Sequence, residues 1–172
     1  MNDSPDVFAL PKGLRVLVTA GASGIGRAIS DLLALRGARV RICDVSDDFL
    51  ANYRAAHRDS SVTKADVARL FADVTASLGG LDALINNAGV AGPTGGVEDI
   101  APADWRRTID VCLTGQFLCS HHGVRMLKAA GGGAIVNFYP QTTDAARVGR
   151  AASLLRSAGH APRELPEPRF AG

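Results

Sequence analysis

Short apolar runs alternate with helical segments along residues 14–138, and this alternation restricts the fold to very few architectures. The apolar runs lie within residues 14–20, 38–43, 61–67, 81–89 and 134–138. They are continuous rather than alternating apolar and polar, and each connection is long enough to hold a helix. Such a pattern predicts parallel strands covered by helices on both faces. We therefore expect an α/β protein with a doubly wound parallel sheet of about five strands.

Helix start and stop signals fit this arrangement. Apolar positions from Ile25 onward have helical spacing, and Gly37 is expected to end that helix. Ser46 is the expected N-cap of a second helix, with two acidic residues in its first turn. A third helix is expected at 68–80. The segment 101–133 is predicted to be one long helix, on which Cys112 and Cys119 share a face as buried small side chains.

Composition excludes several classes of function. The 172 residues suffice for one domain with a real core, and a net charge of +2 gives no footprint for nucleic acid. No apolar run approaches the roughly 20 residues needed to span a membrane. Three cysteines without paired spacing, and no basic-then-apolar start, favour a reducing compartment such as the cytoplasm. No histidine, cysteine and carboxylate spacing indicates a metal site.

The first strand runs into the glycine-rich turn "TAGASGIG", residues 19–26. At this point free backbone N–H groups and the positive end of the helix dipole favour an anion. Gly24 and Gly26 lack a Cβ, so the backbone can approach a pyrophosphate and the helix can approach the strand. A tight turn without a ligand is the alternative for the glycines taken alone.

Asp44 ends the second strand and strengthens the dinucleotide interpretation. It follows Gly26 by 18 residues, where a carboxylate would accept hydrogen bonds from the adenosine ribose. A solvent-facing aspartate at a strand end is the alternative. Asp44 also predicts the cofactor, because a 2′-phosphate about 4 Å away would meet a repulsion of about 4 kcal/mol at intermediate dielectric. No basic residue directly follows Asp44, so NAD is expected rather than NADP.

Three motifs in this order resemble the short-chain dehydrogenase/reductase family, in its NAD-dependent branch. They are the glycine turn, "ADV" at 65–67 and "NNAG" at 86–89, and the resemblance covers roughly residues 13–138. It implies a Rossmann fold with the strand order 3-2-1-4-5. It also implies that Asp66 and Val67 flank the adenine, and that the "NNAG" turn lies beside the cofactor ribose and stabilises the sheet. The predicted cofactor-binding residues are Thr19, Gly21, Ser23, Gly24, Ile25, Gly26, Asp44, Val45, Asp66, Val67, Asn86, Asn87, Ala88 and Gly89.

The sequence departs from the family where the resemblance implies catalysis. The family transfers hydride between NAD and an alcohol or ketone, using a Ser, a Tyr with a Lys four residues later, and an Asn on the long helix. Here Cys112 replaces the Asn, Pro140 stands at the Ser position, and Ser153 and Ser157 fall at the Tyr and Lys positions. No Tyr-x-x-x-Lys occurs in the sequence, so no catalytic residue is predicted. Ala20 also replaces the second glycine-turn residue of the family pattern.

The pattern of strands and helices stops after Phe138. We expect an N-terminal extension at 1–12, an NAD-binding domain at 13–138, and a divergent, partly disordered tail at 139–172 that lacks the family's last strands. A shifted reading frame near residue 138 is one explanation.

The chain is expected to bind NAD with little or no activity. Two alternatives are a non-catalytic nucleotide-sensing or interaction module, and an active dehydrogenase using unrecognised groups. An alcohol or ketone substrate is expected only if the chain is active, and a homo-oligomer is possible through the helix at 103–129.

Overall fold

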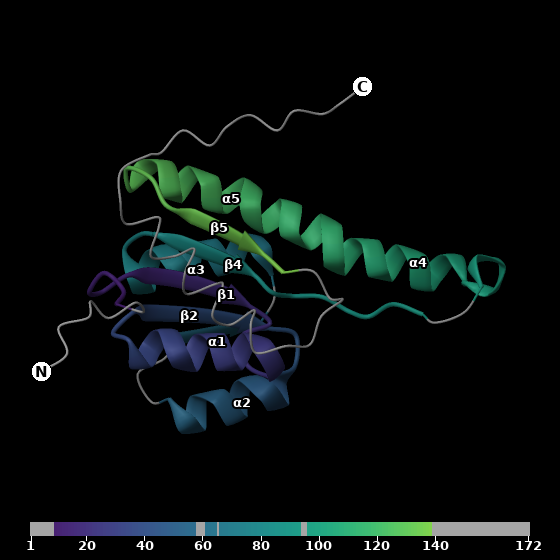
Figure 1. The fold of residues 1–172 in the computed structure, drawn as a ribbon, viewed down its shortest axis with the longest axis horizontal. Coiled ribbons are helices and arrows are strands. Elements are labelled where there is room, and N and C mark those ends of the chain that lie inside the picture. Colours follow the sequence, from purple (N-terminus) through teal and green to yellow (C-terminus); the bar gives the residue numbers. More distant parts are fainter. Residues whose placement is uncertain (1–8, 58–60, 65, 94–95, 139–172) are drawn as a thin grey trace, which may run out of the picture.

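A computed structural model describes residues 9–57, 61–64, 66–93 and 96–138 of the protein. Within these residues a single parallel sheet has the strand order β3-β2-β1-β4-β5, which confirms the predicted doubly wound topology (Figure 1). The strands are β1 (Arg15–Thr19), β2 (Arg39–Asp44), β3 (Ser61–Lys64), β4 (Ala83–Asn86) and β5 (Ala134–Asn137). The chain reverses direction across the sheet between β3 and β4, so a switch point lies between β1 and β4.

The connections between the strands are helical. The helices are α1 (Gly24–Leu35), α2 (Asp47–Ala56), α3 (Val67–Leu78), a short 3-10 turn η1 (Val97–Asp99), α4 (Pro102–Ile109), a π-helical turn η2 (Asp110–Thr114) and α5 (Gly115–Ala129). Gly37, at φ +83°, follows the end of α1 as the sequence predicted. Ser46 caps α2, its hydroxyl accepting the Phe49 N–H at 3.3 Å. The third strand, β3, lies within the predicted segment 61–67, and Asp66 is the N-cap of the following helix α3.

Helices cover both faces of the sheet. One face packs against α1 and α2 through a core that includes Val16, Val18, Ile29, Leu33 and Tyr53. On the other face, α3 and α5 pack against Leu17, Leu84 and their neighbours. Successive residues of β1 point to opposite faces, so a run of apolar residues supplies both cores.

The long helix differs from the sequence prediction. It begins at Pro102 and ends at Ala129, and a π turn at 110–114 interrupts it. Because a π turn contains an extra residue, the seven-residue spacing of Cys112 and Cys119 no longer keeps both on one face. The prediction that both are buried is therefore wrong for Cys112. Cys119 is 7% exposed in the core, whereas Cys112 is half-buried and contacts the loop after β4.

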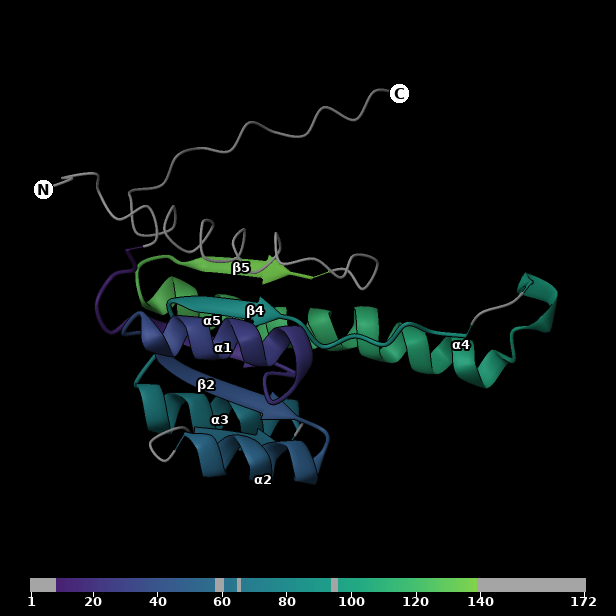
Figure 2. The same cartoon turned by 60° about the horizontal axis from the view of Figure 1, so that its bottom comes forward.

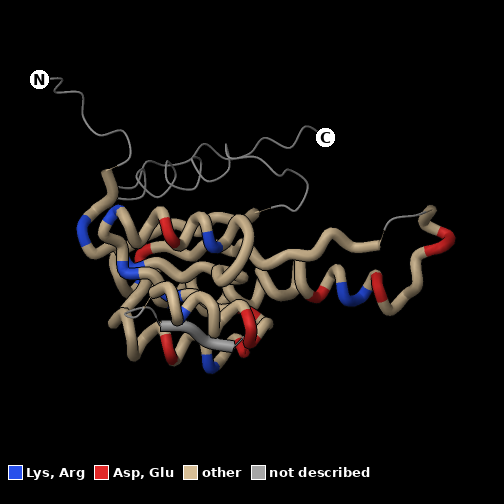
Figure 3. Tube along the Cα trace, turned by 90° about the horizontal axis from the view of Figure 1, so that it is seen from below, with Lys and Arg blue, Asp and Glu red and all other residues tan. Residues whose placement is uncertain are grey.

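Figures 1 and 2 show α5 lying along the sheet while α4 extends beyond it. Three large apolar side chains on this helix are mostly exposed, namely Trp105 at 58%, Leu113 at 62% and Phe117 at 63%. Charged residues of both signs lie along the projecting part (Figure 3). No helix in the part of the chain that the structure describes is long and apolar enough to cross a membrane.

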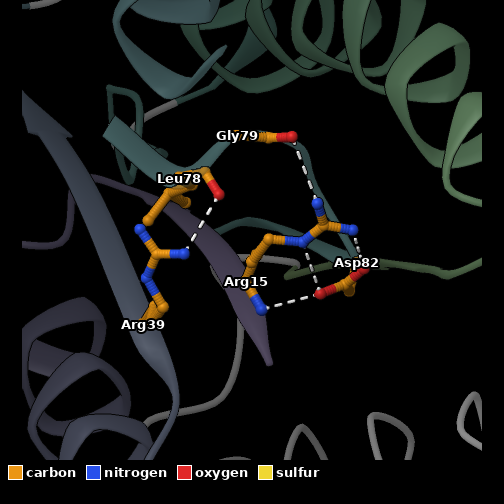
Figure 4. A network of polar contacts seen from close by, with 5 residues as sticks. All are labelled: Arg15, Arg39, Leu78, Gly79 and Asp82. Atoms are coloured by element: carbon orange, nitrogen blue, oxygen red, sulfur yellow. Dashed lines mark hydrogen bonds and ion pairs between the residues drawn. The ribbon is translucent and has the colours of Figure 1, made fainter. Parts of the chain in front are cut away.

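Two arginines hold the amino-terminal edge of the sheet together (Figure 4). The Arg15 guanidinium donates to both carboxylate oxygens of Asp82, at 2.9 and 2.5 Å, and to the carbonyl of Gly79 at 3.2 Å. Arg39 donates to the carbonyls of Ser77 and Leu78 at 2.7 and 3.2 Å. These cations satisfy carbonyls at the carboxyl end of α3, where the helix dipole favours positive charge.

Candidate functional site

The candidate site lies where β1, β2 and β4 end at their carboxyl termini. Parallel pairing sets Thr19 beside Cys43 and Val18 beside Ile85. The glycine turn, Asp44 and the "NNAG" turn therefore leave the sheet from the same edge. This is the edge of an open α/β sheet at which ligands bind, and the switch point lies there too.

The glycine turn is closely packed at two of its glycines. A Cβ on Gly26 would lie 2.1 Å from the Ala20 carbonyl oxygen and 2.4 Å from the Asn87 amide nitrogen. A Cβ on Gly21 would lie 2.7 Å from the Ile42 side chain. Gly24 differs, because it adopts φ +51° and has open space around it. The turn therefore needs glycine at 26 for the contact between helix and loop, and at 24 for its backbone conformation.

Helix α1 begins without a side-chain cap. Ser23 occupies its N-cap position, but the hydroxyl accepts no hydrogen bond from the first turn. In contrast, Ser46 caps α2, and Asp66 caps α3 by accepting the Arg69 N–H at 2.9 Å. Gly24 and Ile25 in this first turn are exposed. The first turn of α1 thus presents backbone N–H groups at the positive end of the helix dipole, which suits an anionic group.

Asp44 is buried and held in one orientation by backbone donors. Its Oδ2 accepts the Ala22 N–H at 3.3 Å, and its Oδ1 accepts the N–H groups of Val45 and Ser46 at 2.8 and 3.2 Å. The carboxylate therefore links the end of β2 to the glycine turn. Its side chain is fixed before any ligand arrives, and this preorganisation reduces the entropy lost on binding. Val45 beside it is 75% exposed.

The "NNAG" turn is hydrogen-bonded to the glycine turn through Thr19 and Asn87. The Thr19 hydroxyl accepts the N–H groups of Asn87 and Ala88, both at 2.9 Å. The Asn87 amide donates to the carbonyls of Thr19 and Ala20 at 3.1 and 3.2 Å. Thr19 is only 4% exposed, so any contribution of this residue to binding is through the shape of the two turns.

Asn86 is buried one residue earlier and connects the sheet to the long helix. Its amide donates to Asn137 Oδ1 on β5 at 2.8 Å and to the Ser120 hydroxyl on α5 at 3.1 Å. Only 1% of this residue is exposed. These bonds link β4 to β5 and to α5. That the turn stabilises the sheet stays a prediction from the resemblance.

The remaining predicted residues lie at the ends of other elements. Asp66 is exposed and engaged as the N-cap of α3, and Val67 is the first residue of that helix. Gly89 is exposed at the end of the "NNAG" turn. The predictions for Pro140, Ser153 and Ser157, and for the tail as a whole, concern residues outside the described ranges. Within the described ranges, no cluster of three metal-ligating side chains occurs.

Sequence reasoning missed two features of this region. The first is the pair of bonds between Cys112 and the backbone of Val90, at 3.3 and 3.4 Å. The second is Arg41, whose buried side chain on β2 pairs with Asp73 of α3 at 3.0 Å. Burial lowers the pKa of the Arg41 guanidinium, and Asp73 partly opposes that shift. No local pattern signals either contact, because each joins residues more than 20 positions apart.

The fold and this arrangement of turns are those of a nicotinamide-enzyme family. The sequence profile described as short chain dehydrogenase matches residues 15–152, and the chain belongs to this family. That match extends past Phe138, where the resemblance carried by the motifs ended. Among solved structures, levodione reductase is similar with a TM-score of 0.69 and 26% identity, over 83% of this chain and 62% of that one. The C-domain of a bacterial malonyl-CoA reductase, solved with NADP, has a TM-score of 0.70 and 30% identity, over 77% of this chain and 23% of that one.

Two curated relatives are dehydrogenases of cyclic or linear alcohols by name. Cis-4-hydroxycyclohexanecarboxylate dehydrogenase of Sinomonas cyclohexanicum is 45% identical over 130 residues, which are 70% of this chain and 52% of the relative. D-threitol dehydrogenase of Mycolicibacterium smegmatis is 40% identical over 145 residues, which are 78% of this chain and 55% of the relative. The chain thus spans about half the length of these relatives.

Proposed function

We propose that residues 13–138 form the NAD-binding domain of a short-chain dehydrogenase/reductase, with 1–12 as an extension and 139–172 as a divergent tail. In this family the reaction is hydride transfer between NAD and an alcohol or ketone. The proposal rests mainly on the joined turns at the sheet edge, where Asp44, the glycine turn and the "NNAG" turn fix one another by hydrogen bonds.

The residues present fit a dinucleotide. The uncapped first turn of α1 offers N–H groups to a pyrophosphate, and the backbone-held Asp44 carboxylate is an acceptor for ribose hydroxyls. Asp66, Val67 and the exposed Val45 would flank the adenine. When bound, the nicotinamide ring of the cofactor would supply the site of hydride exchange. The protein residues named here bind and orient it.

NAD rather than NADP is the cofactor that Asp44 favours. Its carboxylate is buried, and three backbone N–H groups hold it in place, so it cannot easily turn away from a 2′-phosphate. Two like charges about 4 Å apart repel by about 4 kcal/mol at intermediate dielectric. The NADP named for the malonyl-CoA reductase structure belongs to that protein.

We propose weak or absent catalysis by this chain alone. Its sequence contains no Tyr-x-x-x-Lys, and Pro140 stands at the position of the family's Ser. Loss of a positioned general acid costs about 10²–10⁴-fold by itself. The absence of these catalytic residues also favours a second candidate function, a non-catalytic module that binds the nucleotide and changes its binding to a partner in response.

The long helix supplies the proposed contact between copies of the chain. Trp105, Leu113 and Phe117 are each more than half exposed on it, and large apolar groups exposed together commonly mark an interface. A second copy is the partner that we propose for residues 103–129. All three cysteines are free thiols, which supports a reducing compartment such as the cytoplasm.

A calorimetric titration of the purified chain with NADH and NADPH tests the proposal. We expect NADH to bind at least about tenfold more tightly, which corresponds to about 1.4 kcal/mol. Asp44→Ala should weaken NADH binding and reduce the difference in affinity between NADH and NADPH. The matched control is Asp48→Ala, an exposed aspartate in the first turn of α2, which should bind like the wild type.

Two outcomes would contradict this assignment. Absence of NADH binding at millimolar concentration would remove the cofactor proposal. Rapid NADH formation by the same preparation from a panel of alcohols would remove the proposal of weak catalysis. Capture of a partner only in the presence of NAD, without turnover, would favour the nucleotide-sensing module.

A further inference from the structure

The thiol of Cys112 forms two hydrogen bonds with the backbone of a single residue, Val90. The Val90 N–H donates to Cys112 Sγ at 3.3 Å, and the Cys112 thiol donates to the Val90 carbonyl at 3.4 Å. Val90 belongs to residues 87–93, which form neither helix nor strand after β4. A backbone donor and acceptor of this loop residue are therefore satisfied by one side chain, and both bonds are partly buried.

The π turn is what brings Cys112 to the loop. Its wide turn closes with the Gly115 N–H donating to the Asp110 carbonyl, and Cys112 lies in the middle of it. The extra residue rotates Cys112 off the face that Cys119 shares with the core. Single π turns inside α-helices commonly occur at functional positions. In this protein the π turn places Cys112 where its thiol can bond the Val90 backbone.

The same loop is fastened at its other end to the glycine turn. Asn87 and Ala88 are bonded to Thr19, two to three residues before Val90. Further along, Gly92 at φ +75° lies against Thr108 of α4, where a Cβ would come within 3.2 Å of the Thr108 hydroxyl. Residues 87–92 thus bridge from the glycine turn to the long helix, and Cys112 holds the middle of this bridge.

We propose that Cys112 is a positioning residue: its thiol fixes the loop 87–93 to the π turn and so keeps the "NNAG" turn against the glycine turn. This inference rests on the proposed function, since the two turns it joins are the proposed cofactor-binding turns. A thiol is a weaker donor and acceptor than an amide. It nevertheless satisfies both groups of Val90, at the position where the resemblance implied an Asn.

The test uses Cys112→Ala, which removes both bonds, and Cys112→Asn, which restores a donor and an acceptor. Thr114→Ala is the control, because Thr114 is exposed in the same π turn. The first measurement is hydrogen exchange of the Val90 amide in the full chain without cofactor. We expect exchange about tenfold faster in Cys112→Ala, unchanged exchange in β1 and α3, and protection regained in Cys112→Asn.

The second measurement is NADH affinity. We expect it to fall about three- to tenfold in Cys112→Ala, and to return in Cys112→Asn. Unchanged exchange at Val90 in Cys112→Ala overturns the inference, and so does faster exchange that Cys112→Asn does not reverse. Equal NADH affinity in Cys112→Ala and the wild type overturns the inference that Cys112 supports the cofactor-binding turns. Failure of the wild type to bind NADH removes the proposed function, while Val90 exchange still decides whether the thiol holds the loop.

Discussion

Ala20 has the least favourable backbone conformation of the glycine turn. It adopts φ +48°, and among the described residues it is the only non-glycine residue with a positive φ. A Cβ in this left-handed region meets the neighbouring carbonyl, whereas glycine adopts it without strain. The family pattern that the sequence resembles has Gly here, so the chain tolerates the strain instead of avoiding it.

We therefore predict that Ala20→Gly stabilises the protein by about 1 kcal/mol, which raises Tm by about 2–4 °C for a domain of this size. Thermal unfolding followed by circular dichroism measures the change. Ala22→Gly in the same turn is the control, because Ala22 is 2% exposed in the core, so loss of its methyl group should lower Tm. A lower Tm for Ala20→Gly would show that the methyl group at 20 contributes favourable contacts.

At the scale of elements, one ion pair joins β1 to the start of β4. Arg15 and Asp82 are 67 residues apart, and about a quarter of each side chain is exposed. The hydrogen bonds from Arg15 hold the pKa of the Asp82 carboxyl below its ordinary value, although burial opposes this. Asp82 in turn raises the pKa of Arg15. Because the folded pKa of Asp82 is depressed, the pair stabilises the fold above the unfolded carboxyl's pKa of about 3.9.

This stabilisation should disappear as pH falls through the lowered folded pKa. We predict that Asp82→Asn costs about 1–2 kcal/mol at pH 7, and that its difference from the wild type shrinks toward zero in more acidic solution. Urea unfolding across a pH series measures it. Asp99→Asn removes the same charge from an exposed 3-10 turn, and should change stability little at any pH. A cost for Asp82→Asn that did not vary with pH would rule out the ion pair as its cause.

At the scale of the whole molecule, the long helix forms an arm that exposes the apolar side chains of Trp105, Leu113 and Phe117 among charged residues. We predict that the chain self-associates through this arm, and that Phe117→Gln raises the dissociation constant at least about tenfold. Sedimentation velocity over a range of protein concentrations measures the change. Leu35→Gln is the matched control, because Leu35 is 81% exposed on α1, away from the arm. Equal association of both variants would place the contact elsewhere.

Much of the fold follows from local sequence patterns. The apolar runs, the Ser46 cap and Gly37 each depend on residues close along the chain, so periodicity and turn chemistry predict the elements and a parallel sheet. The strand order followed from the family resemblance. The glycine turn and Asp44 are also predictable as a pair, because their spacing follows from one strand–helix–strand unit. Their places at the sheet edge agree with that prediction.

What the sequence by itself determined is the alternation of elements, their order, and the approach of the glycine turn to Asp44. Only the tertiary structure decided that Asn87 and Thr19 join two turns, that a π turn directs Cys112 to Val90, and that Asp82 pairs with Arg15. The physical reason is the range of the interactions. Helix and strand periods arise from neighbours along the chain, whereas each of these contacts joins residues that only packing of the sheet and helices brings together.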